Sequence, residues 1–169
     1  MSMLEEIRTR QSIRKFKDQP IEPEKITTLL KAAMRAPSAA NRQEWRFLVI
    51  SDRESLDAIT TLSPYTKMMS QAQAAIVVSG DHQVMEQDGY IYVDCAAAIE
   101  NILLEAKHLD LGTCWCGIGP NEERIKAFKN YFNLPASYLP VGVIAIGYSN
   151  ENKPLVDRYD ENKITYWKK

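Results

Sequence analysis

The pattern of hydrophobic and polar positions along the chain predicts helices and strands in mixed order. Runs of consecutive apolar residues, rich in valine and isoleucine, predict strands over 46–51, 74–79 and 139–147, with a short extended stretch at 113–116. Apolar residues at helical spacing predict helices over 3–10, from 23 to before Pro37, and over 53–62, 90–111 and 121–132. The polar segment 80–89 predicts a loop. One domain spanning residues 1–169 is the simplest interpretation.

Capping signals support these boundaries. Pro23 suits the first position of a helix, where its missing N–H costs nothing. Asn121 is a predicted N-cap, and Glu122 and Glu123 follow it in the first turn. Gly112 is predicted to end the long helix as its C-terminal cap.

Two segments suggest how the chain packs. The helix predicted over 90–111 is apolar around much of its circumference, so we expect it to be central and largely buried. The final 22 residues are charged and aromatic without a core pattern, and they include Tyr159, Tyr166 and Trp167. We expect this tail, from residue 150 onward, to pack on a partner subunit rather than to extend freely into solvent.

Composition excludes several classes of protein. The chain has 169 residues, of which 45% are hydrophobic and 25% charged, as in soluble globular proteins. The net charge of −1 provides no field that would attract nucleic acid or a membrane surface. No apolar run is long enough to span a bilayer, and three cysteines do not form a disulfide framework. We therefore expect a cytoplasmic protein.

Charge is distributed unevenly along the chain. Residues 1–46 hold ten basic and six acidic side chains, whereas residues 47–169 hold eleven and sixteen. An anionic ligand near the N-terminal segment would explain the basic excess. A solvated helix face also explains the basic excess, and charge alone favours this second interpretation.

The common catalytic signatures are absent from the sequence. It contains no dinucleotide-binding, phosphate-loop, zinc-protease or serine-hydrolase motif. His82 and His108 lack spaced ligand partners, and Cys114 and Cys116 lack the second pair that a zinc site needs. We therefore predict no metal site and buried, reduced cysteines. No residue is assigned as a catalytic nucleophile or base, so any reaction would depend on a cofactor.

Three segments could bind such a cofactor. In Arg10-Gln11-Ser12-Ile13-Arg14-Lys15-Phe16, guanidinium groups match phosphate oxygens and a serine hydroxyl can assist. In Ala36-Pro37-Ser38-Ala39-Ala40-Asn41-Arg42-Gln43-Glu44-Trp45, small residues let a flat ring approach the backbone. In Cys116-Gly117-Ile118-Gly119, glycines allow the same close approach. Each segment alone is also compatible with a purely structural turn or strand end.

Together, the order and spacing of these segments resemble the FMN-dependent nitroreductase family. An arginine in the C-terminal tail, Arg158 in Lys153-Pro154-Leu155-Val156-Asp157-Arg158, extends the resemblance over nearly the whole chain. The resemblance implies an α+β fold, with a central and mainly antiparallel sheet flanked by helices. It also implies an interface-sharing homodimer with two FMN sites, the long helix at the interface and the tail across the partner.

The resemblance implies a role for each basic residue. Arg10 and Ser12 would hold the phosphate or ribityl side of FMN, and Gln11 stands where the family often has arginine. Arg14 would approach the pyrimidine edge of the ring, where positive charge lowers the cost of accepting hydride. Arg158 would clamp the phosphate. Lys67 is a weaker candidate for a ring contact.

The resemblance also implies two groups of residues along the flavin ring. From the opposite subunit, the ring would be lined by Pro37, Ser38, Ala39 and Asn41. Near its reactive edge, backbone groups would come from Cys116, Gly117, Ile118 and Gly119. The electron donor would be NADH or NADPH, and the acceptor a nitroaromatic, quinone or similar small molecule.

Two departures from the family pattern qualify this assignment. Glu44 stands where the family often has proline, and the region 63–90 lacks the additional helices that cover the flavin in many members. An open ring face would leave the choice of acceptor loosely defined. The alternative function is a flavin-binding module for storage, sensing or delivery, or a relative that consumes its own flavin without a separate acceptor.

Overall fold

The computed structural model describes residues 3–168, so residues 1, 2 and 169 of the predicted domain lie outside the described residues. Within that range four strands form one sheet in the order β1-β2-β4-β3, and every neighbouring pair is antiparallel. The strands are β1 (Trp45–Ile50), β2 (Ala74–Asp81), β3 (Gly112–Gly117) and β4 (Tyr138–Gly147). The predicted α+β fold with a mainly antiparallel sheet is confirmed.

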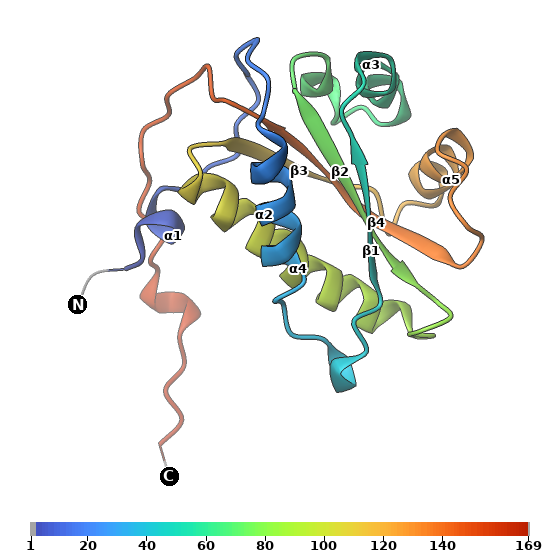
Figure 1. Cartoon of the computed structure of the whole chain (residues 1–169). Coiled ribbons are helices and arrows are strands. Elements are labelled where there is room, and N and C mark those ends of the chain that lie inside the picture. Colours follow the sequence, from blue (N-terminus) through green and yellow to red (C-terminus); the bar gives the residue numbers. More distant parts are fainter. Residues whose placement is uncertain (1–2, 169) are drawn as a thin grey trace.

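Helices cover both faces of the sheet (Figure 1). One face is covered by α2 (Pro23–Ala33) and α4 (Asp88–His108), with α1 (Glu5–Thr9) packed on α4. The other face is covered by α3 (Arg53–Leu62) and α5 (Glu122–Tyr131). Short 3-10 turns occupy Ala39–Asn41, Lys67–Ser70 and Glu161–Lys163.

Burial on both faces explains why β2 and β4 are continuous apolar runs rather than alternating ones. In β2, Ile76 and Val78 face α2 and α4, whereas Ala75 and Val77 face α3 and α5. A register shift opposite Val78 and Ser79 leaves Val141 of β4 without a strand partner. Such a bulge adds one residue to the strand. Side chains before and after it can therefore face the same layer, although their positions differ by an odd number of residues.

The helix α4 is the central element that its apolar pattern predicts. Eight of its side chains are buried: Ile91, Asp94, Cys95, Ala98, Ile99, Ile102, Leu103 and Ala106. The prediction that Gly112 caps this helix is wrong. Asp110 takes the left-handed position (φ 60°), and the amides of Asp110 and Leu111 bond to the carbonyls of Lys107 and Ala106. Gly112 instead begins β3.

Other predicted boundaries need smaller corrections. The segment 80–89 is not all loop, because β2 continues to Asp81 and α4 begins at Asp88. The first helix covers only Glu5–Thr9 of the predicted 3–10. The predicted N-cap of α5 is confirmed, since the Asn121 side chain accepts the amide of Arg124 at 2.9 Å.

Residues 12–17 run as an extended segment along the edge formed by β3 and the end of β4. The amide of Ile13 donates to the carbonyl of Thr113, and that of Lys17 to the carbonyl of Tyr148, both at 2.8 Å. Phe16 packs directly over Gly147, where an added Cβ would lie 2.8 Å from the ring. The N-terminal basic segment is thereby held beside β3.

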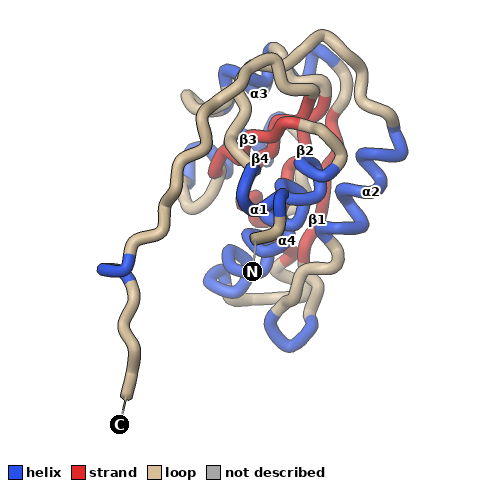
Figure 2. Tube along the Cα trace, turned by 90° about the vertical axis from the view of Figure 1, so that its left-hand side faces the viewer, coloured by secondary structure: helices blue, strands red, loops and turns tan. Residues whose placement is uncertain are grey.

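The C-terminal segment leaves the body of the molecule after β4 (Figure 2). Its aromatic side chains are exposed, with 77% of Tyr166 and 86% of Trp167 accessible. No helix within residues 3–168 is long and apolar enough to cross a membrane.

Two glycines with contrasting surroundings, Gly147 and Gly89, give a matched test of the packing at the sheet edge. We expect Gly147→Ala to destabilise the fold by about 1–3 kcal/mol, because its methyl group would overlap Phe16. Gly89→Ala in α4 meets nothing within 4 Å and should raise stability by up to about 1 kcal/mol. Urea unfolding of both variants measures this. Equal effects of the two substitutions would contradict the close packing of residues 12–17.

Candidate functional site

Two cavities lie on either side of the extended segment that carries the predicted basic residues. The first, here called the Arg10 cavity, has a volume of about 180 Å³ and is lined by Arg10, Gln11, Thr113 and Lys153 among others. The second, the Arg14 cavity, has a volume of about 430 Å³. Because the bridge between Ser12 and Thr113 separates them, the two cavities follow one another along the edge of the sheet.

Paired charges surround the Arg10 cavity. The Nε of Arg10 lies 3.6 Å from a carboxylate oxygen of Glu100 on α4. The Nζ of Lys153 donates to the carbonyl of Ser12 at 2.6 Å and lies 3.0 Å from Glu151. The cavity therefore offers two cations whose present partners are partly exposed carboxylates, and an anion could compete for both.

Glu151 joins the tail to the N-terminal segment. Its Oε1 accepts the backbone amide of Arg14 at 2.6 Å. This hydrogen bond, followed by the contact with Lys153, lowers the pKa of Glu151 below its usual range despite partial burial. The ionised carboxylate thus holds the backbone of Arg14 in place.

The Arg14 cavity brings together residues from three distant parts of the chain. Its lining includes Arg14, Tyr65, Lys67, Cys116 and Gly117. The thiol of Cys116 donates to the carbonyl of Tyr65 at 3.2 Å, which ties β3 to the turn before Lys67. The two cations Arg14 and Lys67 therefore line a concave space whose other lining residues are mostly apolar, aromatic or sulfur-containing.

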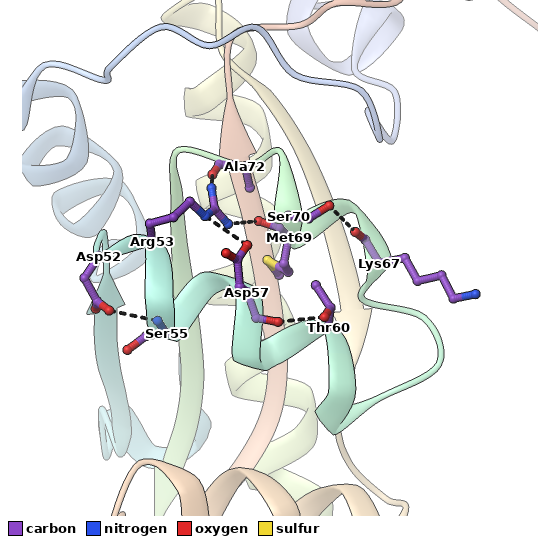
Figure 3. A network of polar contacts seen from close by, with 9 residues as sticks. All are labelled: Asp52, Arg53, Ser55, Asp57, Thr60, Lys67, Met69, Ser70 and Ala72. Atoms are coloured by element: carbon purple, nitrogen blue, oxygen red, sulfur yellow. Dashed lines mark hydrogen bonds and ion pairs between the residues drawn. The ribbon is translucent and has the colours of Figure 1, made fainter.

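A polar network behind the cavity positions Lys67 (Figure 3). Arg53 of α3 donates to the carbonyls of Met69 and Ala72 and pairs with Asp57 at 3.0 Å. These contacts fix the Lys67–Ser70 turn against α3. In Figure 3 the Lys67 side chain extends away from the network, so its ammonium group is left available to the cavity.

The paired cysteines of β3 are both buried, as predicted, and neither forms a disulfide. Their side chains share the face that packs on α3 and α5. The neighbouring Cys116 thiol lowers the pKa of Cys114 to about 7, and the positive charges of Arg14 and Lys153 act in the same direction. The Cys114 side chain and burial raise the pKa of Cys116. No cluster of metal-ligating side chains occurs within residues 3–168.

The second predicted segment forms a loop at the other end of α4. Ala39 and Ala40 line a separate cavity of about 560 Å³ with Tyr90, whereas Lys107 lines the Arg10 cavity. Tyr90 and Lys107 are 17 residues apart on α4, or roughly 25 Å along its axis. One protomer therefore does not bring the Ser38–Asn41 segment together with the Arg10–Arg14 segment.

Left-handed backbone conformations concentrate in this loop. Ala40, Asn41 and Gln43 have φ values of 49°, 54° and 54°. For residues with a Cβ this region costs roughly 1–2 kcal/mol each, and asparagine tolerates it best. Side-chain hydrogen bonds support the turn, because Ser38 accepts the amide of Gln43 and Asn41 accepts its side-chain amide, both at 3.0 Å. Such strain persists where the surroundings impose it, often at functional sites.

Several predicted site residues line neither the Arg10 cavity nor the Arg14 cavity. The side chain of Ile118 is buried in the core, and the amides of Ile118 and Gly119 both donate to the carbonyl of Val141. Arg158 is exposed in the tail. Pro37 lies in the same loop as Ala39.

The residues that sequence reasoning missed are Lys153, Tyr65 and Arg124. Lys153 occurs five residues before Arg158, and its position in the same tail segment was the available signal. Arg124 donates to the carbonyl of Gly117 at 2.7 Å and lies 5.3 Å from the centre of the Tyr65 ring. No motif in the sequence links these two positions.

The fold and the order of these segments match a known protein family. The model of the nitroreductase family matches residues 7–89 and 63–148. The chain belongs to the nitroreductase family.

Individual nitroreductase-like proteins match over nearly their full length. A candidate NADH dehydrogenase/NAD(P)H nitroreductase of Archaeoglobus fulgidus is 40% identical over 165 residues, which are 95% of each protein. The structure of a candidate NADH oxidase from Clostridium acetobutylicum is 44% identical with a TM-score of 0.93, covering 98% of this chain and all of that one. An FMN-dependent nitroreductase structure from Clostridium difficile R20291 is 30% identical with a TM-score of 0.90, covering 97% and 98%.

The role of Glu151 in holding the nitroreductase-family N-terminal segment can be measured through acid unfolding. Because its pKa is lowered in the folded state, Glu151 stabilises the fold above the ordinary value of 4.5, and this contribution is lost as pH falls through the lowered pKa. Glu151→Gln should therefore be less stable than wild type near neutral pH, with the difference shrinking in acid. Thermal unfolding across pH measures this, with the exposed Glu86→Gln as control. A difference that does not change with pH would contradict it.

Proposed function

We propose that this protein binds FMN and works as an NAD(P)H-dependent oxidoreductase on small acceptors such as nitroaromatics and quinones. The observation that carries the proposal is the alignment of two cation-lined cavities along residues 10–14. FMN has the matching chemistry, with a phosphate at one end and an electron-accepting ring at the other. Supporting this, the similar protein from Clostridium difficile is described as an FMN-dependent nitroreductase.

The donor set fits such a ligand. Arg10 and Lys153 in the Arg10 cavity would hold the phosphate, with Gln11 and Ser12 beside them. The Arg14 cavity has the size of a small-molecule site and would take the ring. Of the other predicted residues, Cys116 and Gly117 line that cavity, whereas Ile118 and Gly119 do not, and their amides donate to the carbonyl of Val141.

The proposed chemistry separates cofactor from protein. When bound, FMN would accept a hydride from the nicotinamide and pass electrons to the acceptor. The protein would supply position and charge: Arg14 and Lys67 place two cations where negative charge develops, in a partly enclosed space. The Ser63–Gln87 region contains one 3-10 turn and β2 but no α-helix, which favours an open site and a broad range of small acceptors.

A complete site needs a second copy of the chain. The loop containing Pro37, Ser38, Ala39 and Asn41 lies at the opposite end of α4 from the two cavities, so in this proposal it lines the ring of the partner's FMN. Exposed apolar side chains on or beside α1, α2 and α4 would be available to such an interface: Leu4, Ile7, Met34, Tyr90 and Val93. The extended tail would place Arg158 on the partner's phosphate site.

A direct test uses the visible spectrum and the reduction kinetics of the purified protein. We expect a yellow homodimer with one FMN per chain, bleached rapidly under anaerobic conditions by NADH or NADPH and reoxidised by a nitroaromatic or quinone. Tight FMN binding with only slow reduction by both nicotinamides would instead favour a storage or delivery module. A monomer that remains colourless after incubation with FMN would overturn the proposal.

The three reduced cysteines agree with the cytoplasmic location that we propose.

Two arginine substitutions separate the ring end from the phosphate end. Arg14→Ala should weaken FMN binding about tenfold or more and slow its reduction, because a charged contact near the ring is lost. Arg158→Ala should weaken binding while leaving the reduction rate of the bound cofactor unchanged. FMN titration and anaerobic stopped-flow reduction measure the two effects. If Arg158→Ala changed only the reduction rate, its phosphate role would be wrong.

A further inference from the structure

Glu44 is a fully buried acidic residue directly before β1. Its exposed fraction is 0%, and neither carboxylate oxygen has a hydrogen-bond donor among residues 3–168. An ionised carboxylate in that position would carry the full cost of desolvation without compensation.

The surroundings of Glu44 contain one cation, and that cation is already engaged. Arg46 on the same strand donates to the carbonyls of Glu44 and Trp45 and pairs with Asp81 of β2 at 3.1 Å. From α4, Asp94 faces Glu44 and is itself only 6% exposed. The remaining titratable neighbour is the buried thiol of Cys95, next to Asp94 in α4, whose pKa is raised to about 12 by burial and by these two acids.

Asp94 connects Glu44 to the strained loop. Its Oδ2 accepts the backbone amide of Ala39 at 2.7 Å. Ala39 directly precedes Ala40 and Asn41, two of the three residues in left-handed conformations. The carboxylate of Asp94 therefore holds the first residue of the turn against α4, and whatever orients Asp94 also orients the loop.

We propose that Glu44 is protonated in the folded protein and donates a hydrogen bond to Asp94, making it a positioning residue for the Ser38–Asn41 loop. The added proton turns one Glu44 oxygen into a donor toward Asp94, while Oδ2 of Asp94 accepts the Ala39 amide. One negative charge is then shared by two buried carboxyl groups, instead of two charges repelling each other. The link to flavin binding rests on the proposed function, in which this loop lines the ring in the partner subunit.

The electrostatics of the site agree with this assignment. Burial raises the pKa of Glu44, and the neighbouring Asp94 carboxyl group raises it further, against the opposing effects of the Glu44 backbone amide and of Arg46. For an acid with a raised pKa, the stability linked to its proton is fully present below the ordinary value of 4.5. That stability is lost as pH rises through the raised folded-state value. The loop should therefore loosen on the alkaline side.

The proton itself can be observed by carbon-13 NMR of the side-chain carboxyl groups in flavin-free protein. The Glu44 resonance is identified by its absence in Glu44→Gln. We expect the chemical shift of a protonated carboxyl group at a pH where the exposed glutamates are ionised. A resonance that titrates with the exposed glutamates would overturn the proposal.

Amide hydrogen exchange at Ala39 tests the positioning role in the same flavin-free protein. Glu44→Gln keeps a donor toward Asp94, so it should match the wild-type protection where Glu44 is protonated and retain it as pH rises through the raised Glu44 pKa, where wild type loses it. Glu44→Leu removes the donor and should lower protection about tenfold or more. Glu54→Gln, an exposed glutamate of α3, serves as the matched control. Equal protection of Ala39 in Glu44→Gln and Glu44→Leu would overturn the positioning role. If Glu44→Leu does not fold, the pH dependence of Glu44→Gln and the Glu44 carboxyl resonance still test the proposal.

FMN titration separates this inference from the proposed function. If wild type and Glu44→Gln bind FMN equally while Glu44→Leu binds more weakly, both stand. If no form binds FMN, but the NMR and hydrogen-exchange results are as expected, the proposed function fails and the hydrogen bond from Glu44 to Asp94 stands. If FMN binds normally but Glu44 proves ionised, only the proposed hydrogen bond from Glu44 to Asp94 is wrong.

Discussion

The backbone pairing of residues 12–17 with the edge of the sheet determines where the charged groups of the site lie. Hydrogen bonds to Thr113 and Tyr148 hold this segment beside β3, and Phe16 is seated against Gly147. Arg10 and Arg14 are consequently displayed on the two sides of one short bridge. Side-chain charges alone could not place them so, because exposed ion pairs contribute little energy and tolerate many geometries.

The length of α4 imposes the second constraint on the molecule. Its C-terminal half packs near the N-terminal basic segment, and its N-terminal half supports the Ala39 loop through Asp94. A rigid helix keeps these two parts of the nitroreductase-family motif apart within one chain. This separation is the physical reason for proposing a shared site between two copies, and the exposed aromatic tail is consistent with that arrangement.

Burial affects the acidic groups of the two regions in opposite ways. Glu151 sits at the open edge, where a backbone amide and Lys153 favour its ionised form. Glu44 sits beneath the loop, where burial and Asp94 favour its neutral form. The same side-chain type therefore holds one segment as an anion and, in our proposal, another as a neutral donor. The environment, and not the residue type, decides which.

The sequence by itself determined the elements and the family. Apolar runs buried on both faces identify β2 and β4, helical spacing identifies α4, and the Asn121 cap signal is local, so short-range patterns suffice for each. Only the tertiary structure decided that Asp110 rather than Gly112 caps α4, that Lys153 joins Arg10, and that Glu44 lies against Asp94. Two of those outcomes depend on contacts between residues 50 and 141 positions apart, and the third on a choice between competing local conformations. Neither leaves a period or spacing that a single sequence can display.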